Sequence, residues 1–96
     1  MFLLLVDLIA KPGKENDLKA VFENLVEPSR AEAGCIEYTL YQSQDNPSAF
    51  TVVEKWENQA ALDNHETLPH FTENLPKVGD LLAQAPAARK LDVAVG

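Results

Sequence analysis

The stretch CIEYTLYQSQDNPSAFTVVEKW, from Cys35 to Trp56, decides the fold of this chain. Its two ends, Cys35–Gln42 and Ala49–Trp56, are rich in β-branched and aromatic residues, which favour extended strands. The polar segment SQDNPS between them is typical of the connection in a hairpin. The pattern therefore predicts two neighbouring antiparallel strands in the middle of the chain.

Before this hairpin, the sequence predicts a strand followed by a long helix. Phe2–Ala10 is an apolar run with a single charge, and its length suits a strand buried on both faces. Between residues 14 and 33, apolar residues recur with the helical period; they are Leu18, Val21, Phe22, Leu25 and Val26. We expect Gly34 to cap the C-terminus of this helix and Pro28 to bend its last turns or split them off.

After the hairpin, we expect two shorter helical segments and a last strand. Asn58 can cap a helix that runs to about Glu66, and Pro69 fits the first turn of the next helix. The apolar stripe of that helix, which Pro76 interrupts, is predicted to consist of Phe71, Leu75, Val78 and Leu82. The chain closes with Ala88–Val95, where Leu91, Val93 and Val95 alternate as in a half-buried strand.

The order of these elements, β-α-β-β-α-β, defines a fold class. A right-handed crossover from the first strand to the second leaves room between them for the third. The last helical segment returns the fourth strand to the free side of the first. The sequence therefore predicts a ferredoxin-like α+β fold, an antiparallel sheet of strand order 4-1-3-2 with the helices on one face.

The first strand has apolar side chains on both faces, and helices on one side of the sheet can cover only one of them. Phe2, Leu4, Val6 and Leu8 belong to one face, and Leu3, Leu5 and Ile9 belong to the other. A second copy, stacked sheet to sheet, is the natural cover for the remaining face. We therefore expect a homodimer.

Composition and charge restrict the class of partner. The chain has 96 residues, 46% hydrophobic and 24% charged, which is typical of a single globular domain over residues 1–96. Its 8 Lys and Arg are scattered among 15 Asp and Glu, for a net charge of −7, so we expect no nucleic-acid partner. No apolar run approaches the roughly 20 residues of a membrane span. The single Cys35 fits a reducing compartment, and we expect a cytoplasmic protein with no membrane partner.

Five short motifs, taken in order, resemble the antibiotic biosynthesis monooxygenase (ABM) domain family, which includes cofactor-free quinol and anthrone monooxygenases. The resemblance runs from about Phe2 to Leu91, and it depends on the order and spacing of the motifs together. They are Lys-Pro-Gly at Lys11–Gly13, Glu-Pro-Ser-Arg at Glu27–Arg30, Gly34-Cys35, Glu-Lys-Trp-Glu at Glu54–Glu57, and His65 with His70-Phe71.

The resemblance implies an assembly and a chemistry. It implies a dimeric α+β barrel with a pocket between sheet and helices in each subunit. The oxygenases of the family need neither metal nor flavin, because a deprotonated aromatic substrate passes an electron to dioxygen and the protein supplies a dry cavity, a base and hydrogen-bond donors. We therefore expect a cofactor-independent monooxygenase that acts on a quinol-like or polycyclic phenolic substrate. The chain has no phosphate-binding glycine motif, and Cys35, His65 and His70 match no zinc pattern, so we expect no cofactor and no metal.

Two other functions stay open at this point. Isomerases similar to this family share the histidine pair, so the chain could isomerise a small carbonyl or sugar-phosphate signalling compound, although the net charge of −7 modestly favours a quinol. The other alternative is a non-catalytic dimeric protein that binds a small aromatic or carbonyl ligand. Haem degradation is disfavoured, because Val6, His65 and Leu75 stand where such relatives carry Asn, Trp and His.

His65 and His70 are the predicted catalytic residues. His65 follows Leu62 by three residues and Ala61 by four, which places it on the inner face of the short helix. Its imidazole can accept a phenolic proton or stabilise the resulting anion, but a buried structural histidine would fit the same position. His70 begins the next helix, where it could assist at the pocket mouth or cap the turn.

The predicted substrate-binding residues are Trp56, Phe71, Tyr38, Glu54 and Phe22. The aromatic rings serve as pocket wall or as core. Tyr38 and Tyr41 point to opposite faces of their strand because their separation is odd, so only one of them can face the pocket.

Three further polar or reactive side chains stand in apolar surroundings. Asp7 and Glu54 are carboxylates within predicted strands, so each is expected to meet a donor, with Lys55 and Arg30 as the candidates. Cys35 is expected to be a small buried hydrophobe rather than an activated thiolate.

Overall fold

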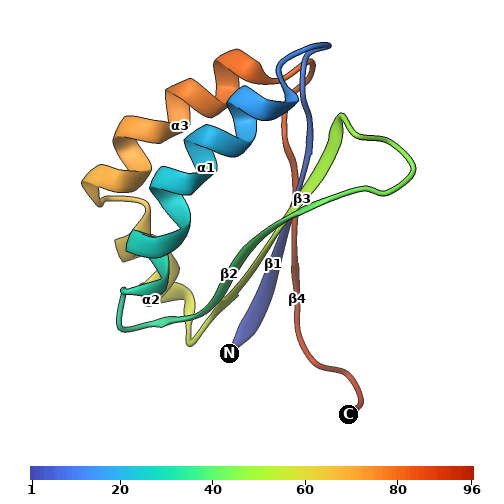
Figure 1. Cartoon of the computed structure of the whole chain (residues 1–96). Helices are drawn as coiled ribbons and strands as arrows, with labels where there is room; N and C mark the ends of the chain where they lie inside the picture. The colour runs from blue at the N-terminus through green and yellow to red at the C-terminus, as the bar shows by residue number, and fades with distance from the viewer.

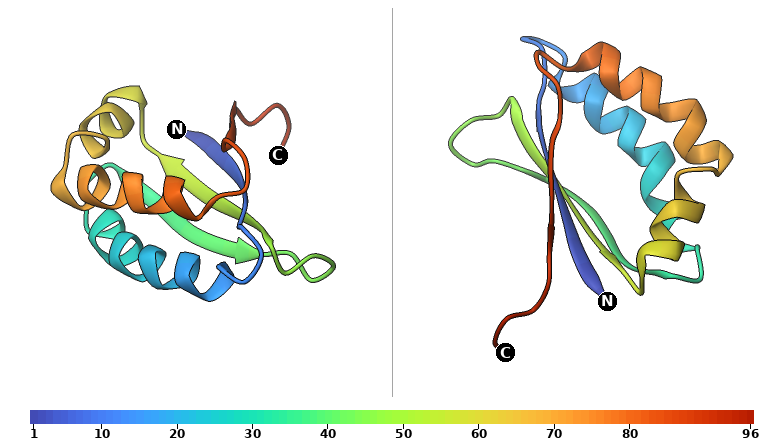
Figure 2. Two further views of the ribbon diagram at one scale, coloured as in Figure 1. Left: turned by 90° about the horizontal axis from the view of Figure 1, so that it is seen from above. Right: turned by 180° about the vertical axis from the view of Figure 1, so that it is seen from behind.

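In the computed structural model, which describes residues 1–96, a four-stranded antiparallel sheet carries all three helices on one side (Figure 1). The elements are β1 (Phe2–Ile9), α1 (Glu15–Arg30), β2 (Cys35–Gln42), β3 (Ala49–Trp56), α2 (Gln59–His65), α3 (Pro69–Leu81) and β4 (Ala87–Leu91). The strand order is β2-β3-β1-β4, and the views from above and from behind show the same two layers (Figure 2). The predicted ferredoxin-like α+β fold and its sheet order are both confirmed.

The central hairpin has the predicted limits. β2 and β3 pair from Cys35 opposite Trp56 to Gln42 opposite Phe50, with a bulge after Cys35. β3 also pairs along its whole length with β1. As a central strand, β3 buries every second side chain under the helices, and these are Phe50, Val52, Glu54 and Trp56.

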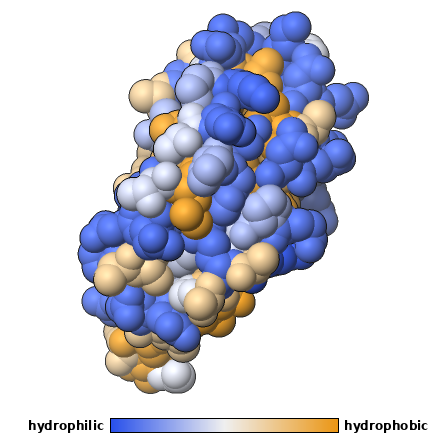
Figure 3. Space-filling view, turned by 90° about the vertical axis from the view of Figure 1, so that its left-hand side faces the viewer, coloured by the Kyte–Doolittle hydropathy of each residue, from blue (hydrophilic) through white to orange (hydrophobic).

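The core lies between this side of the sheet and the helices. Leu18, Phe22 and Leu25 of α1 are buried, as the helical period predicts. They belong to one cluster with Leu4 and Leu8 of β1 and with buried residues of every other element except β4. Each such buried aliphatic side chain contributes about 1.5–3 kcal/mol relative to exposure. The outer side of the helices is mostly hydrophilic, with a few interrupted apolar areas (Figure 3).

Neither internal proline ends its helix. α1 continues past Pro28 to Arg30, and α3 continues past Pro76 to Leu81, so Pro28 does not split off the last turns of α1, which was one of its two expected effects. A proline leaves the carbonyl four residues earlier without its helical hydrogen bond. Those carbonyls belong to Asn24 and Thr72, which are exposed, so water can hydrogen-bond to them.

Gly34 is required by close packing and not by a helix cap. The C-cap residue of α1 is Ala31, in the right-handed helical conformation, and Gly34 does not have a positive φ. The expected glycine cap is therefore wrong. A β carbon at position 34 would collide with the β carbon of Ala61 in α2, and the Gly34 carbonyl accepts a hydrogen bond from the Glu57 N–H at 2.9 Å.

The two later helices begin where the sequence predicts. The Asn58 side chain accepts a hydrogen bond from the Ala61 N–H at 2.9 Å and caps α2, and Pro69 is in the first turn of α3. Val78 is buried, but Leu75 of the same predicted stripe is 51% exposed. None of the three helices has the length and hydropathy needed to cross a membrane.

β4 is shorter and more exposed than the sequence predicts. It ends at Leu91, and the predicted continuation is wrong, because Val93 and Val95 lie beyond the strand and are 67% and 94% exposed. Leu91 pairs with Leu3, so the chain beyond it soon passes the start of β1 and has no partner strand (Figure 1).

The side of the sheet away from the helices, here called the open face, is covered by no other element (Figure 2). Leu3, Leu5 and Ile9 of β1 lie on it and are half-buried. Asp7 is exposed there and accepts a hydrogen bond from the Thr51 hydroxyl at 2.7 Å. The predicted ion pair of Asp7 with Lys55 or Arg30 is therefore wrong, since a cross-strand hydroxyl serves as the donor.

Candidate active site

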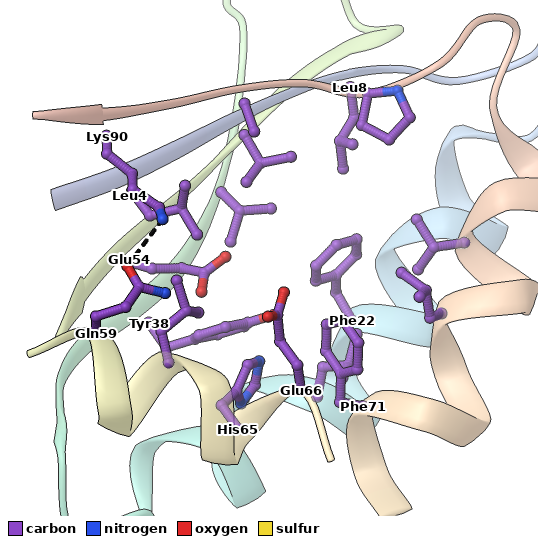
Figure 4. Close-up of a pocket in the computed structure, with 18 residues that line it drawn as sticks. Leu4, Leu8, Phe22, Tyr38, Glu54, Gln59, His65, Glu66, Phe71 and Lys90 are labelled. Carbon is purple, nitrogen blue, oxygen red and sulfur yellow. Dashed lines mark hydrogen bonds between the residues drawn. The ribbon is translucent and has the colours of Figure 1, made fainter. Parts of the chain in front are cut away.

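A cavity of about 500 Å³ lies between the sheet and the helices (Figure 4). Eighteen residues line it, and 12 of them are hydrophobic. Such a volume and lining are typical of a site for a small organic ligand. The polar lining consists of Tyr38, Glu54, Gln59, His65, Glu66 and Lys90.

The local folding of two elements aims the main polar groups into this cavity. Glu54 takes a buried position in the alternation of β3, directly opposite Tyr38 of β2. The cap at Asn58 fixes the start of α2, and His65 at its end lies one helical turn after Leu62 on the same inner face. Figure 4 shows Tyr38, Glu54 and His65 gathered at one end of the cavity.

His65 is almost fully buried, at 1% exposure, on the inner face of α2 as predicted. Aromatic rings surround it, with centroid distances of 4.7 Å to Trp56, 5.1 Å to Phe71 and 5.7 Å to Tyr38. Its Nδ1 lies 2.7 Å from Oε2 of Glu32. No protein group hydrogen-bonds to its Nε2, so that nitrogen is the one free to meet a ligand.

Glu32 joins the two histidines. The same Oε2 atom lies 2.7 Å from Nε2 of His70, while Oε1 is buried without a hydrogen-bond partner. The side chain of Glu32 is 9% exposed, and that of His70 is 18% exposed. Sequence reasoning missed Glu32, because it lies in the loop between α1 and β2, where no periodicity predicts the direction of a side chain.

Glu32, His65 and His70 also form a set of donors that a metal ion could use, with all three ligand atoms within 4.8 Å of one another. Zinc bonds of about 2.0–2.2 Å in a tetrahedral site keep neighbouring ligand atoms about 3.4 Å apart. The two contacts of 2.7 Å are shorter and have the length of hydrogen bonds. The three side chains would have to spread before they could hold an ion.

Glu54 is the second buried acid of the site. It is 6% exposed, and its Oε1 accepts a hydrogen bond from the indole N–H of Trp56 at 3.0 Å. Burial raises the pKa of Glu54 to about 7, against the opposing effect of the Trp56 hydrogen bond, and the charges of Glu66 and Glu32 raise it further. The carboxyl group can therefore hold or release a proton near neutral pH.

The donor predicted for Glu54 is wrong, because Arg30 points elsewhere. Its Nε donates to the Tyr38 carbonyl at 2.9 Å, and its side chain also contacts Thr39 and Glu27. A neutral indole donor satisfies Glu54 instead, which is consistent with a carboxyl group that is partly protonated near pH 7.

Tyr38 is the tyrosine that faces the cavity, and Tyr41 is 53% exposed, so the expectation that only one of them reaches the pocket is confirmed. Burial and the nearby charge of Glu54 raise the pKa of Tyr38. Its phenol therefore stays neutral and can donate a hydrogen bond. Burial, with the charges of Glu32 and Glu54, also raises the pKa of the Cys35 thiol, to about 11, so Cys35 is not an activated thiolate.

The remaining predicted residues divide into two groups. Phe22 and Phe71 line the cavity as its aromatic wall. Trp56 and His70 do not line it. The indole of Trp56 hydrogen-bonds to Glu54 and packs against the His65 ring, and the one carboxylate that His70 contacts is that of Glu32. The structure therefore brings His65, His70, Trp56 and Glu54 into one connected cluster.

Sequence reasoning also missed three exposed polar residues that line the cavity. Lys90 of β4 donates a hydrogen bond to Gln59 Oε1 of α2 at 2.8 Å (Figure 4). This contact links the edge strand to the start of α2, and Glu66 lines the cavity beyond the end of α2. Their positions follow from the tertiary arrangement, which no local pattern in the sequence reports.

The fold and the site define a class, a small ferredoxin-like protein with an aromatic-walled cavity and a cluster of acid and base groups at one end. The sequence model described as antibiotic biosynthesis monooxygenase matches residues 1–74, and the chain belongs to this family.

The chain is 42% identical over 81 residues to an uncharacterized protein of Synechocystis. The match covers 84% of this chain but only 54% of that protein, so the chain spans about half of its length. It is 33% identical over 81 residues to the Mycobacterium tuberculosis protein named putative monooxygenase Rv0793, covering 84% of the chain and 79% of that protein. A crystal structure described as an antibiotic biosynthesis monooxygenase superposes with a TM-score of 0.93 at 28% identity, covering 99% of this chain and 100% of the other.

Proposed function

We propose that the protein is a cofactor-independent monooxygenase that oxidises a quinol-like or polycyclic phenolic substrate with dioxygen. The observation that carries this proposal is His65, a buried imidazole with one ring nitrogen free at the wall of a mainly apolar cavity. An aromatic substrate would pack against Phe22 and Phe71, and its hydroxyl group would lie against His65. Family membership supports the class of reaction.

In this proposal, the reaction starts when His65 accepts the phenolic proton of the substrate. The resulting anion transfers an electron to dioxygen, and the two radicals combine into a peroxide. When the O–O bond breaks, one oxygen atom stays in the product and the other leaves as water. The substrate supplies all four electrons and both hydrogens of that water, so no external reductant is needed.

Further residues have supporting roles in the proposal. The neutral phenol of Tyr38 donates a hydrogen bond to the substrate anion, whose charge is stabilised in the dry cavity. Glu54, with its pKa of about 7, supplies a proton to the departing oxygen and regains one that the substrate released, and Trp56 holds its carboxyl group in place. His70 assists through the carboxylate of Glu32.

We further propose that residues 1–96 act as one ABM-type domain in a cytoplasmic homodimer, the dimeric α+β barrel. The half-buried Leu3, Leu5 and Ile9 on the open face support this assembly, because a second sheet would remove them from water. The cavity lies on the helix side, so each subunit would keep its own.

The test is oxygen uptake with a panel of hydroquinones and anthrones, together with mass spectrometry of the product formed under ¹⁸O₂. We expect one labelled oxygen atom per product molecule and a loss of turnover of about 100-fold or more in His65→Ala. Glu73→Gln, an exposed change on α3, is the control and should keep the wild-type rate.

Other outcomes would contradict the oxygenase. Turnover of a small carbonyl or sugar-phosphate compound without oxygen uptake would assign an isomerase. Thermal stabilisation by an aromatic ligand without any product would assign a non-catalytic binding protein. Undiminished oxygenation by His65→Ala would remove His65 from the reaction.

A further inference from the structure

We propose that Glu32 is a positioning residue. Its Oε2 atom, which lies between the two histidines, fixes His65 in the tautomer with the proton on Nδ1 and leaves Nε2 unprotonated and facing the cavity. The inference rests on the proposed function, in which His65 is the base. It assigns a role to a loop residue that touches neither the cavity nor a substrate.

The hydrogen-bond geometry leads to this assignment. An ionised carboxylate can only accept hydrogen bonds, and a neutral imidazole carries one N–H. Oε2 of Glu32 lies 2.7 Å from Nδ1 of His65 and 2.7 Å from Nε2 of His70. With Glu32 ionised, both rings donate to it, so in their neutral forms His65 carries its N–H on Nδ1 and His70 carries its N–H on Nε2. The remaining nitrogen of His65 is a proton acceptor.

Burial makes this arrangement strong. The side chain of Glu32 is 9% exposed and Oε1 has no partner, so the two imidazole N–H groups supply all the side-chain hydrogen bonds that this carboxylate receives. Contacts of 2.7 Å are typical of hydrogen bonds to an ionised acceptor. The other carboxyl groups near the cluster are Glu54 and Glu66, and no Lys or Arg forms an ion pair with Glu32.

The consequence for the reaction follows from the tautomer. With the opposite tautomer, His65 would present an N–H to the cavity and could not accept the substrate proton. When His65 accepts that proton at Nε2, the carboxylate beside Nδ1 stabilises the imidazolium. His70 holds the same oxygen from the other side and keeps Glu32 aimed at His65.

The first test needs no substrate. Nitrogen-15 NMR of the histidine rings in the wild-type protein at pH 7.5 should show an unprotonated Nε2 and a protonated Nδ1 for His65, and a protonated Nε2 for His70. A protonated Nε2 on His65 would overturn the proposal. A change of both ring spectra after removal of bound metal with EDTA would overturn it as well, because the three residues would then be a metal site.

Two variants complete the test. In Glu32→Gln, the amide can donate to Nδ1, so we expect His65 to change to the tautomer with the proton on Nε2. In His70→Gln, the amide can donate to Glu32 as the imidazole does, so His65 should keep its tautomer. An unchanged His65 spectrum in folded Glu32→Gln would contradict the proposal, and the wild-type spectrum decides it if that variant does not fold.

Kinetics link the tautomer to turnover. With an accepted quinol, Glu32→Gln should lower kcat by about 100-fold or more and leave KM within about threefold, because the variant loses the base and not the aromatic wall. Glu73→Gln is the control. If no quinol is oxidised, the proposed function fails while the NMR result still decides the role of Glu32; an unchanged kcat in Glu32→Gln would contradict that role alone.

Discussion

Glu54 combines burial with a single neutral donor, and this makes its protonation sensitive to pH in the neutral range. Its pKa rises from 4.5 to about 7 in the folded chain, mainly because burial disfavours the charged form. The residue therefore makes the stability of the fold depend on pH, and in the proposed reaction it also supplies a proton.

The stability effect has a definite sign. Between pH 4.5 and about 7 the folded chain keeps a proton that the unfolded chain releases, so the contribution of Glu54 is fully present below pH 4.5 and is lost as the pH rises through 7. The difference corresponds to about 3 kcal/mol. In Glu54→Gln, which cannot ionise, the free energy of unfolding relative to wild type should rise by up to that amount between pH 5 and pH 8.

Urea unfolding of both proteins at these two pH values measures the effect. Glu73→Gln changes the same charge at an exposed position and should show no such trend. An equal pH dependence in wild type and Glu54→Gln would mean that Glu54 is ionised in the folded chain throughout this range.

The loop between α1 and β2 approaches α2 so closely that position 34 accepts only glycine without a shift. A β carbon at Gly34 would meet the β carbon of Ala61, one turn before His65. The packing of this loop against α2 thus sets the distance from Glu32 to His65.

Gly34→Ala is therefore expected to lower the free energy of unfolding by about 1–3 kcal/mol through overpacking. Ala61→Gly alone should cost up to about 1 kcal/mol in helix propensity. Because Ala61→Gly removes the colliding atom, the double variant should lose less unfolding free energy than the two single variants lose together. Thermal or urea unfolding of all three would measure this. Additive losses would mean that the two residues do not share this contact.

The success of sequence reasoning varies with the element. The hairpin, the cap at Asn58 and the inward direction of His65 follow from local patterns, because alternation, capping chemistry and helical spacing each act within a few residues. The end of β4 was not predictable in this way, because Val93 and Val95 alternate correctly but have no partner strand. Glu32 was missed for the same reason, since its partners lie 33 and 38 residues further along the chain.

One side of the sheet, with Leu3, Leu5 and Ile9 on it, is covered by no other element, and this indicates how two copies would meet. Leu5 pairs with Val53 on one neighbouring strand and with Arg89 on the other, which places it in the interior of the open face. A charge at this position would be buried in a sheet-to-sheet dimer at a high desolvation cost.

Leu5→Lys should therefore convert a dimer into a monomer, measured by sedimentation velocity at micromolar concentration. Ala20→Lys introduces the same charge on the exposed side of α1 and should leave the dimer intact. A Leu5→Lys variant that stays dimeric would place the interface elsewhere. A wild-type protein that sediments as a monomer would contradict the dimer.

The hydrogen-bonded cluster of Glu32, His65 and His70 draws its members from a loop and from two helices. None of these segments can assemble the cluster alone, so it forms only after all three have docked onto the sheet. A partly folded chain, or one whose α2 has transiently detached, would lack the oriented His65 on which the proposed function depends, even if the aromatic wall were intact. In the proposed reaction, such a chain could not activate an aromatic compound toward dioxygen, so oxidation would depend on the fully folded site.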